Sequence, residues 1–433
     1  MKKPIIVSLA NVSEDHIVVT LKIGFILEKC GSFFEGVSQL LETISYGGKG
    51  EFKAERTNAR EEYQVKVIGF ENDEFATING FETTGRIQIA IPLKLCPVSL
   101  GIPQILSVSM YASVYSFISE YQITDIHLPD AYLKHLPKPK YGTSIFSGNE
   151  TDLRIGMILK PRSILNDEIA NVLIGSAVNA GIDYIIDDEI TVDPEEWRFK
   201  ERIEFITNLL NQLNTGKQNK VKYIANISGS YDTSLKFAKL ADKYGVDGIM
   251  VNTITMGYDV VQTLAKNKKF KPFIVANVIG RNLMAGGPKY LVADHIHSFF
   301  ARISGADAVY TGPFVGNVKS RQEKASHFIW ALTDQLSRRH PITKSYAVMS
   351  GGLEPKNLLQ NYRVYSSPVM FSIGLNLCNL IEQEAPIDKV IKIIKTVFAA
   401  EKIGGEERVN QEITKLASKN KEYYQILNSL QWT

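Results

Sequence analysis

The stretch Gly181–Ile190 reads GIDYIIDDEI and sets the pattern for the rest of the chain. Its first half is an apolar run typical of a buried β-strand. Three consecutive carboxylates, Asp187, Asp188 and Glu189, follow this run directly. Adjacent like charges repel one another unless a cation or a hydrogen-bond donor lies among them. The stretch therefore predicts a β-strand whose carboxyl end carries acidic side chains with a function.

The chain from Arg154 onward repeats this order of an apolar strand and a helix. Strands that are apolar on both faces and alternate with helices indicate parallel pairing. Eight such units predict an α/β fold, a (β/α)8 TIM barrel, and a doubly wound open sheet is the alternative. The predicted strands are Ile155–Lys160, Ile182–Ile186, Val221–Ile227, Gly248–Asn252, Phe273–Val278, Ala308–Tyr310, Tyr346–Met349 and Val369–Ile373. The predicted helices include Asp167–Asn179, Glu195–Leu213, Ser234–Tyr244, Lys289–Ile303 and Arg321–Ser337.

Residues 1–142 lack this regular alternation, so we expect a smaller α+β N-terminal domain there. The proline-rich segment His135–Gly142 is predicted to be the linker. Residues 143–433 then form the barrel domain, with Pro386–Leu430 as a helical tail. The predicted N-terminal strands are His16–Leu27, Glu62–Gly69 and Gly85–Pro92, and the predicted helices are Gly36–Ile44 and Ile102–Phe117.

Composition narrows the class of protein. The chain has 433 residues, of which 44% are hydrophobic and 22% charged, as in soluble globular proteins. The net charge of +3 gives no reason to expect a nucleic acid or an anionic membrane as partner. No signal segment or membrane-spanning run is found in the sequence. Three widely spaced cysteines argue against disulfides and zinc, so we expect a cytoplasmic protein.

Polar residues stand at the ends of most predicted barrel strands, where barrel enzymes place their chemistry. A single polar strand end is routine, since every strand must reach the surface, but a nearly complete set favours an active site. The residues concerned are Lys160 and Arg162 after the first strand, Asp187–Glu189 after the second, Asn226, Asn252 and Asn277 at the next three, Ser350–Gly352 after the seventh and Gly374 after the eighth.

Two of these groups suggest ligands. Ser350, Gly351, Gly352 and the turn at Gly374 follow the last two strands, where barrels commonly bind phosphate through backbone N–H groups. An ordinary tight turn is the alternative. Asp188 and Glu189 offer the hard oxygen ligands that Mg²⁺ prefers, and the alternative is an acidic start to the following helix.

The ordered motifs GMILKPR, GIDYIIDDE, YIANISG, GADAVYTGPFVGN and AVMSGG resemble the RuBisCO large-subunit superfamily. In the first part of the chain, IPQILSVSMYASVYSF and ITDIHLPDAYL resemble the segments that join that family's N-terminal domain to its barrel. The resemblance thus covers nearly the whole chain. It implies the two-domain fold, an active site at the strand ends, and a homodimer or a multiple of dimers.

The resemblance also implies roles for single residues. Lys160 matches the family's first-strand lysine, and Arg162 stands where the same motif has a second lysine. Asp188 and Glu189 match two ligands of the family's Mg²⁺ ion. The third ligand is a carbamylated lysine in the family, and Ile186 at this position has no amine, so no carbamate is expected.

Further departures concern the family's catalytic loop and histidines. The mobile-loop lysine is Asn317 here, with Lys319 two residues further on. Asn277 and Tyr310 stand where the family has histidines. These losses argue against carboxylation, and the sequence resembles RuBisCO-like proteins of form IV. That group implies enolase, isomerase or decarboxylase activity on phosphorylated sugar-derived compounds.

The sequence therefore predicts enolisation, isomerisation or decarboxylation of a small phosphorylated keto-sugar. The alternative is a catalytically silent family member that binds a phosphorylated metabolite or a partner protein. We expect Lys160 and Arg162 in catalysis, Asp188 and Glu189 on Mg²⁺ or on substrate hydroxyls, Ser350, Gly351, Gly352 and Gly374 on phosphate, and Asn226, Asn252 and Asn277 as residues that orient substrate oxygens.

Overall fold

The chain divides into two compact units in a computed structural model. The first comprises Met1–Leu136, Gly280–Ile303 and Gln335–Ile342, and the second comprises the remainder. The sequence predicts one boundary near residue 142, whereas the first unit also takes two later segments of the chain. The structure describes residues 14–47, 61–78, 81–146, 153–163, 165–285, 287–316, 324–337, 339–366, 368–419 and 421–432.

The first unit is built on a five-stranded sheet with the strand order β10-β4-β1-β3-β2. Strand β1 pairs antiparallel with β3 on one side and β4 on the other. Helix α2 lies close to β1, because a Cβ at Gly36 would meet the Phe25 ring at 2.5 Å. The strands are β1 (His16–Ile26), β2 (Lys66–Ile78), β3 (Glu82–Pro92), β4 (Ile118–His127) and β10 (Tyr290–Val292), and the helices are α1 (Leu27–Cys30), α2 (Phe33–Tyr46), α4 (Gly101–Met110), α5 (Asp130–Leu133), α11 (Arg281–Ala285) and α12 (Asp294–Ile303).

Two predicted helices of this unit are too long. The segment predicted as a helix from Lys289 begins with strand β10, whose Tyr290 is in register with Tyr121 of β4. The backbone N–H of Tyr121 donates to the carbonyl of Lys289 at 2.7 Å, so pairing with a distant strand replaces the first helical turn. The helix predicted for Ile102–Phe117 ends at Met110 and continues as a 3₁₀ turn, and strand β4 was not predicted.

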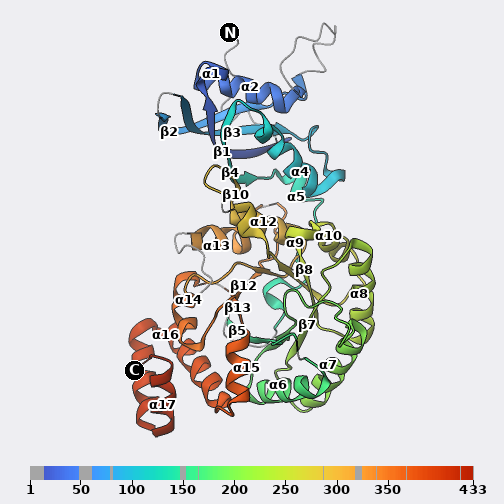
Figure 1. The fold of residues 1–433 in the computed structure, drawn as a ribbon, viewed down its shortest axis with the longest axis vertical. Helices are drawn as coiled ribbons and strands as arrows, with labels where there is room; N and C mark the ends of the chain where they lie inside the picture. Colours follow the sequence, from blue (N-terminus) through green and yellow to red (C-terminus); the bar gives the residue numbers. More distant parts are fainter. Residues whose placement is uncertain are drawn as a thin grey trace. The chain divides into compact units, whose positions relative to one another are not determined.

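The second unit is a closed barrel with the strand order β11-β12-β13-β5-β6-β7-β8-β9. Neighbouring strands pair in parallel throughout, which confirms the predicted barrel over the open sheet. Helices ring the strands in Figure 1. The barrel strands are β5 (Leu153–Ile158), β6 (Tyr184–Ile186), β7 (Lys222–Asn226), β8 (Gly248–Asn252), β9 (Phe273–Asn277), β11 (Ala308–Tyr310), β12 (Tyr346–Ser350) and β13 (Val369–Ile373).

Local signals in the sequence set the barrel helices. The Asn166 side chain caps α6 by accepting from Ile169 N, and Gly181 ends the helix in a left-handed conformation. Helix α16 is interrupted at Gly404 and Gly405.

None of the helices in the ranges that the structure describes is long and apolar enough to cross a bilayer. The helices are α6 (Asp167–Ala180), α7 (Phe199–Leu213), α8 (Tyr231–Tyr244), α9 (Thr253–Met256), α10 (Asp259–Lys266), α13 (Ala325–Thr333), α14 (Leu358–Tyr365), α15 (Leu375–Glu382), α16 (Ile387–Lys419) and α17 (Lys421–Ser429).

Candidate functional site

Lys160 and the acids of the opening stretch meet at the carboxyl ends of β5 and β6. These strands are neighbours, and the ladder continues past them, because Leu159 N donates to Ile186 O at 3.0 Å. Lys160 and Asp188 come just after this last backbone bond, and their side chains contact each other. The Lys160 Nζ atom lies 2.8 Å from Asp188 Oδ2. The predicted catalytic lysine is thus ion-paired to a predicted metal ligand.

Asp188 is surrounded by donors from its own chain. Its side chain is only 2% exposed. In addition to the ion pair of its Oδ2 atom with Lys160, its Oδ1 atom lies 3.5 Å from Arg162 Nη1 and accepts from Ile190 N at 3.0 Å. Both carboxylate oxygens therefore have a cationic partner, and the turn after β6 is held by one of them.

Glu189 joins this acid pair to the predicted phosphate turn. Its Oε1 atom accepts a hydrogen bond from Ser350 Oγ at 3.0 Å, and its Oε2 atom lies 4.0 Å from Lys160 Nζ. Ser350 is the last residue of β12, which is separated from β6 by β13 and β5 in the barrel. Lys160, Arg162, Asp188, Glu189 and Ser350 form one cluster, which we call the rim cluster.

Asp187 does not belong to the rim cluster. It forms a buried ion pair with Arg202 of α7, with Asp187 Oδ2 3.2 Å from Nη2 and both side chains 1% exposed. It also accepts hydrogen bonds from the Tyr223 hydroxyl at 2.8 Å and from Asn226 N at 2.9 Å. Burial and the neighbouring Asp187 charge raise the pKa of Tyr223 well above its usual value. The first of the three acids therefore fastens the turn to the barrel wall.

The three strand-end asparagines bond to backbone atoms of the loops. Asn226 Nδ2 donates to the carbonyls of Asp188 and Glu189 at 3.1 and 2.9 Å, so it holds the acid turn directly. Asn252 accepts from Ile254 N and donates to the carbonyl of Ile279. Asn277 accepts from Ile279 N at 2.8 Å. Through these hydrogen bonds the three asparagine side chains hold the loops at the carboxyl ends of the strands.

The glycines of the predicted phosphate site take conformations that suit them. Gly351 and Gly352 have φ of +104° and +63°, which side chains rarely adopt. Gly374 precedes α15, and a Cβ there would meet Lys160 Cδ and Cε at 3.2 and 3.3 Å. The glycine at this position therefore leaves room for the Lys160 side chain.

Two tyrosines and a serine inside the barrel add polar groups near the site, and one of them, Tyr310, stands where the family resemblance places a histidine. Tyr184 OH lies 2.8 Å from Ser372 Oγ, and its ring fills the space above Gly156, where a Cβ would meet it at 2.2 Å. Burial raises the pKa of Tyr310 well above its usual value, and the charge of Glu189 adds to the effect. Tyr184 and Ser372 also affect the pKa of Tyr310, so these buried hydroxyls lie near one another and near Glu189 of the rim cluster.

Asn361 of α14 was also missed, because a helical asparagine carries no signal in the sequence. It is fully buried. Its Oδ1 accepts from Phe314 N and Val315 N at 2.7 and 2.9 Å, and its Nδ2 donates to the Val315 and Asn357 carbonyls at 2.8 and 2.9 Å. Asn361 thus clamps the chain after β11. Asn317 and Lys319, which the sequence places further along that loop, lie outside the described residues.

The rim cluster does not fit a Mg²⁺ ion in the way the sequence predicts. Mg²⁺ requires oxygen ligands in near-octahedral geometry. Asp188 is instead ion-paired to Lys160 and lies near Arg162. The position that the resemblance assigns to the third ligand is the fully buried, apolar Ile186. Within the described part of the chain, no group of three or more His, Cys, Asp or Glu side chains could hold a metal.

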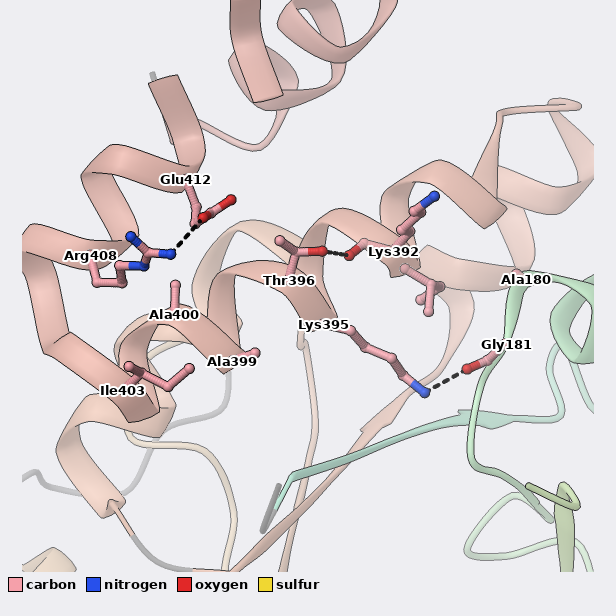
Figure 2. A pocket seen from close by; sticks show the side chains of 11 residues that line it. Ala180, Gly181, Lys392, Lys395, Thr396, Ala399, Ala400, Ile403, Arg408 and Glu412 are labelled. Carbon is pink, nitrogen blue, oxygen red and sulfur yellow. Dashed lines mark hydrogen bonds and ion pairs between the residues drawn. The ribbon is translucent and has the colours of Figure 1, made fainter. Parts of the chain in front are cut away.

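A separate cavity lies away from the rim. It has a volume of about 560 Å³, and its walls come from the end of α6 and from α16 (Figure 2). Lys395 Nζ, on its edge, donates to the carbonyl of Gly181 at 2.6 Å. Gly181 precedes β6, whereas Asp188 follows it, so this cavity is at the opposite end of the strand from the rim cluster.

Comparison with known proteins gives relatives of three descriptions, which are diketo-phosphate enolases, ribulose bisphosphate carboxylases and a carboxylase-like protein. A 2,3-diketo-5-methylthiopentyl-1-phosphate enolase of Geobacillus thermodenitrificans is 27% identical over 252 residues, which are 55% of this chain and 58% of that protein. A ribulose bisphosphate carboxylase-like protein of Archaeoglobus fulgidus is 24% identical over 352 residues, 79% of this chain and 78% of the other. The match to the enolase thus spans little more than half of its length.

The fold agrees with these matches. The dimeric archaeal Rubisco from Hyperthermus butylicus superposes with a TM-score of 0.80 at 17% identity, covering 99% of each chain. Residues 140–374, which carry the barrel strands and the rim cluster, match the family described as ribulose bisphosphate carboxylase large chain, catalytic domain. The chain belongs to this family, and its relatives there include RuBisCO-like proteins.

Proposed function

We propose that this chain enolises a small phosphorylated keto-sugar, as a RuBisCO-like enzyme that does not carboxylate. Isomerisation and decarboxylation of such compounds pass through the same enediolate, so they belong to the same proposal. The observation that carries it is the bond from Ser350 to Glu189 at 3.0 Å, because it joins the proton-transfer groups to the turn that suits a phosphate.

Lys160 and Glu189 have complementary roles in this proposal. The Lys160 ammonium gives a proton to the carbonyl oxygen of the substrate, and the Glu189 carboxylate takes the proton from the neighbouring carbon. One proton leaves carbon and one reaches oxygen, so no other reactant is needed. The 4.0 Å between Lys160 Nζ and Glu189 Oε2 leaves both groups within reach of adjacent substrate atoms.

The remaining residues of the rim cluster position these two groups. Asp188 orients the Lys160 ammonium through their 2.8 Å contact. Arg162 is half exposed, so its guanidinium is available to an anionic or carbonyl oxygen. We propose that Asp188 acts on Lys160 and that Glu189, besides taking the carbon proton, contacts a substrate hydroxyl. Contact with substrate hydroxyls is the alternative to Mg²⁺ that the sequence leaves open for these two acids.

A phosphate group would bind at the turns after β12 and β13. Gly351, Gly352 and Gly374 allow the close approach of a phosphate to backbone N–H groups. Ser350 is half-buried at the same turn. The relative from Geobacillus is named for a phosphorylated diketone, and this supports a phosphorylated ketone as the substrate class.

Solvent exchange tests the proposal directly. The protein is incubated in D₂O with ribulose 1-phosphate, ribulose 1,5-bisphosphate and a 2,3-diketo 1-phosphate, and ¹H NMR follows the loss of the proton next to the carbonyl. We expect exchange with at least one compound. Lys160→Met and Glu189→Gln should lower it about 100-fold or more, which is typical for the loss of a general acid or base.

Ligand-induced thermal stabilisation separates this function from simple binding. A bound compound raises the melting temperature by mass action. Stabilisation by phosphorylated ketones with no exchange and no product would favour the alternative, a family member that binds a metabolite. Exchange that persists in Lys160→Met would contradict the role given to Lys160.

We also propose that the chain assembles as a homodimer or a multiple of dimers. The dimeric state of the Hyperthermus butylicus relative supports this assembly. Light scattering coupled to size exclusion should give an even multiple of the 48.4 kDa chain mass. A monomeric mass at micromolar concentration would contradict it.

A further inference from the structure

We infer that the Lys160 ammonium takes the place of a divalent cation in the rim cluster, and that Lys160 keeps divalent metals out of it. The inference deepens the proposed function, on which its chemical consequence rests. The metal-binding part stands on the geometry of four charged side chains and does not require any substrate.

The carboxylates of the rim cluster are already neutralised by cations of the same chain. Asp188 Oδ2 lies 2.8 Å from Lys160 Nζ, and Asp188 Oδ1 lies 3.5 Å from Arg162 Nη1. Glu189 Oε2 lies 4.0 Å from Lys160 Nζ. Two negative and two positive charges therefore share the cluster. Carbonyl and carboxylate oxygens attract a divalent cation where their negative charge is in excess. The rim cluster has no such excess.

Asp187, the third acid after β6, cannot supply the additional negative charge that a divalent cation would need. Asp187 follows the same strand but is ion-paired to Arg202 at 3.2 Å inside the barrel wall. A metal at Asp188 would need this carboxylate to leave a buried ion pair and two further hydrogen bonds, from Tyr223 and from Asn226 N. Loss of a partner from such a pair is strongly unfavourable.

The space around Lys160 is shaped for this side chain. Gly374 borders its Cδ and Cε atoms, and a Cβ there would press on them at 3.2 and 3.3 Å. Asp188 is nearly fully buried, so the ammonium is held against the protein on one side, while 29% of the Lys160 side chain remains exposed on the other. The same ammonium can therefore face a ligand while it stays bonded to Asp188.

The chemical consequence concerns where a substrate oxygen would bind. A cation that stabilises an enediolate oxygen is required beside the reacting carbons. Lys160, with Arg162 next to it, supplies this charge from the chain itself. The site then suits a substrate with two neighbouring oxygens, one on the ammonium and one on the guanidinium, and it works in the presence of a chelator.

Manganese binding tests the inference with the full-length protein. Mn²⁺ is titrated and free ion is followed by electron paramagnetic resonance. We expect the wild type to show no site that depends on Asp188 below millimolar Mn²⁺. Lys160→Met removes one positive charge and keeps an unbranched stem, so it should bind Mn²⁺ at least tenfold more tightly than the wild type. Asp188→Asn in the Lys160→Met background should abolish that gain.

Lys222→Met is the matched control, because Lys222 also contacts an aspartate, Asp247 at 3.3 Å, but stands at the start of β7 and away from the rim. It should gain no Mn²⁺ site. The inference is overturned if the wild type binds one Mn²⁺ per chain and Asp188→Asn abolishes this binding. It is equally overturned if folded Lys160→Met gains nothing. The wild-type titration decides the matter even if a variant fails to fold, and it is independent of whether any sugar phosphate is turned over.

Discussion

Replacing Arg202 with methionine is expected to lower the free energy of unfolding of the barrel unit by about 3–5 kcal/mol, the usual cost of removing one partner from a buried ion pair. The Arg202 side chain is 1% exposed and donates to Asp187 Oδ2 through Nε and Nη2 at 3.3 and 3.2 Å. It also donates to the carbonyls of Trp197 and Val192 at 3.1 and 2.7 Å. Methionine fills the volume of the stem and leaves the Asp187 carboxylate buried without its cation.

Urea unfolding followed by circular dichroism measures this loss. Arg198→Met is the matched control near the start of the same helix, because Arg198 is about half exposed and its 3.6 Å contact with Asp193 is a surface ion pair. Such pairs contribute about 0–1 kcal/mol. The double variant Asp187→Leu, Arg202→Met should lose less than the sum of the two single variants. A loss below about 1 kcal/mol in Arg202→Met would refute the reasoning that this pair fastens the acid turn.

Three further predictions concern packing, the loop after β11 and pH. Gly156→Ala should cost about 1–3 kcal/mol of stability, because the added Cβ overpacks against Tyr184. Gly175→Ala is the control: its Cβ has open space, so the change should be neutral or should stabilise α6. Paired thermal melts measure both effects. Asn361→Ala should cost about 3 kcal/mol, because it removes four hydrogen bonds to backbone groups, two of them buried and two part-buried. Proteolysis should then cut the loop after β11 faster, and unchanged cleavage would contradict the clamp. Burial lowers the pKa of His297 to about 4 in the folded protein, whereas an unfolded histidine has a pKa of ~6.5. The free energy of unfolding is therefore highest above pH ~6.5 and falls by about 3 kcal/mol as the pH drops to ~4. His297→Gln should flatten this dependence in urea midpoints measured from pH 7.5 to 5, and an unchanged slope would assign it to other groups.

The barrel was predictable because its signals are local. All eight strands, including the short ones at Tyr184–Ile186 and Ala308–Tyr310, are mainly apolar runs with a polar residue or a glycine at their last position or within two residues of it. The N-terminal unit was less predictable, since β10 forms by pairing with β4, more than a hundred residues earlier in the chain, and a segment with helical periodicity gives no sign of such a partner.

The site was predictable in part for a similar reason. The strand ends identify Lys160, Asp188, Glu189 and Ser350, and the barrel brings them together. Which of the three adjacent acids belong to the rim cluster depends on the turn after β6, and the contact with Arg202 reveals that Asp187 faces helix α7 instead. Residues such as Asn361 act through buried backbone bonds, which depend on packing between distant segments.

The most direct test of the central claim is the rate of solvent deuterium incorporation into a phosphorylated ketone by chelator-treated protein. The rim cluster supplies its own cation through the 2.8 Å contact of Lys160 with Asp188, so the account predicts exchange that is unchanged by EDTA and lost in Lys160→Met. Exchange that disappears with EDTA and returns with Mg²⁺ would contradict the account. So would the absence of exchange with every phosphorylated ketone that stabilises the protein.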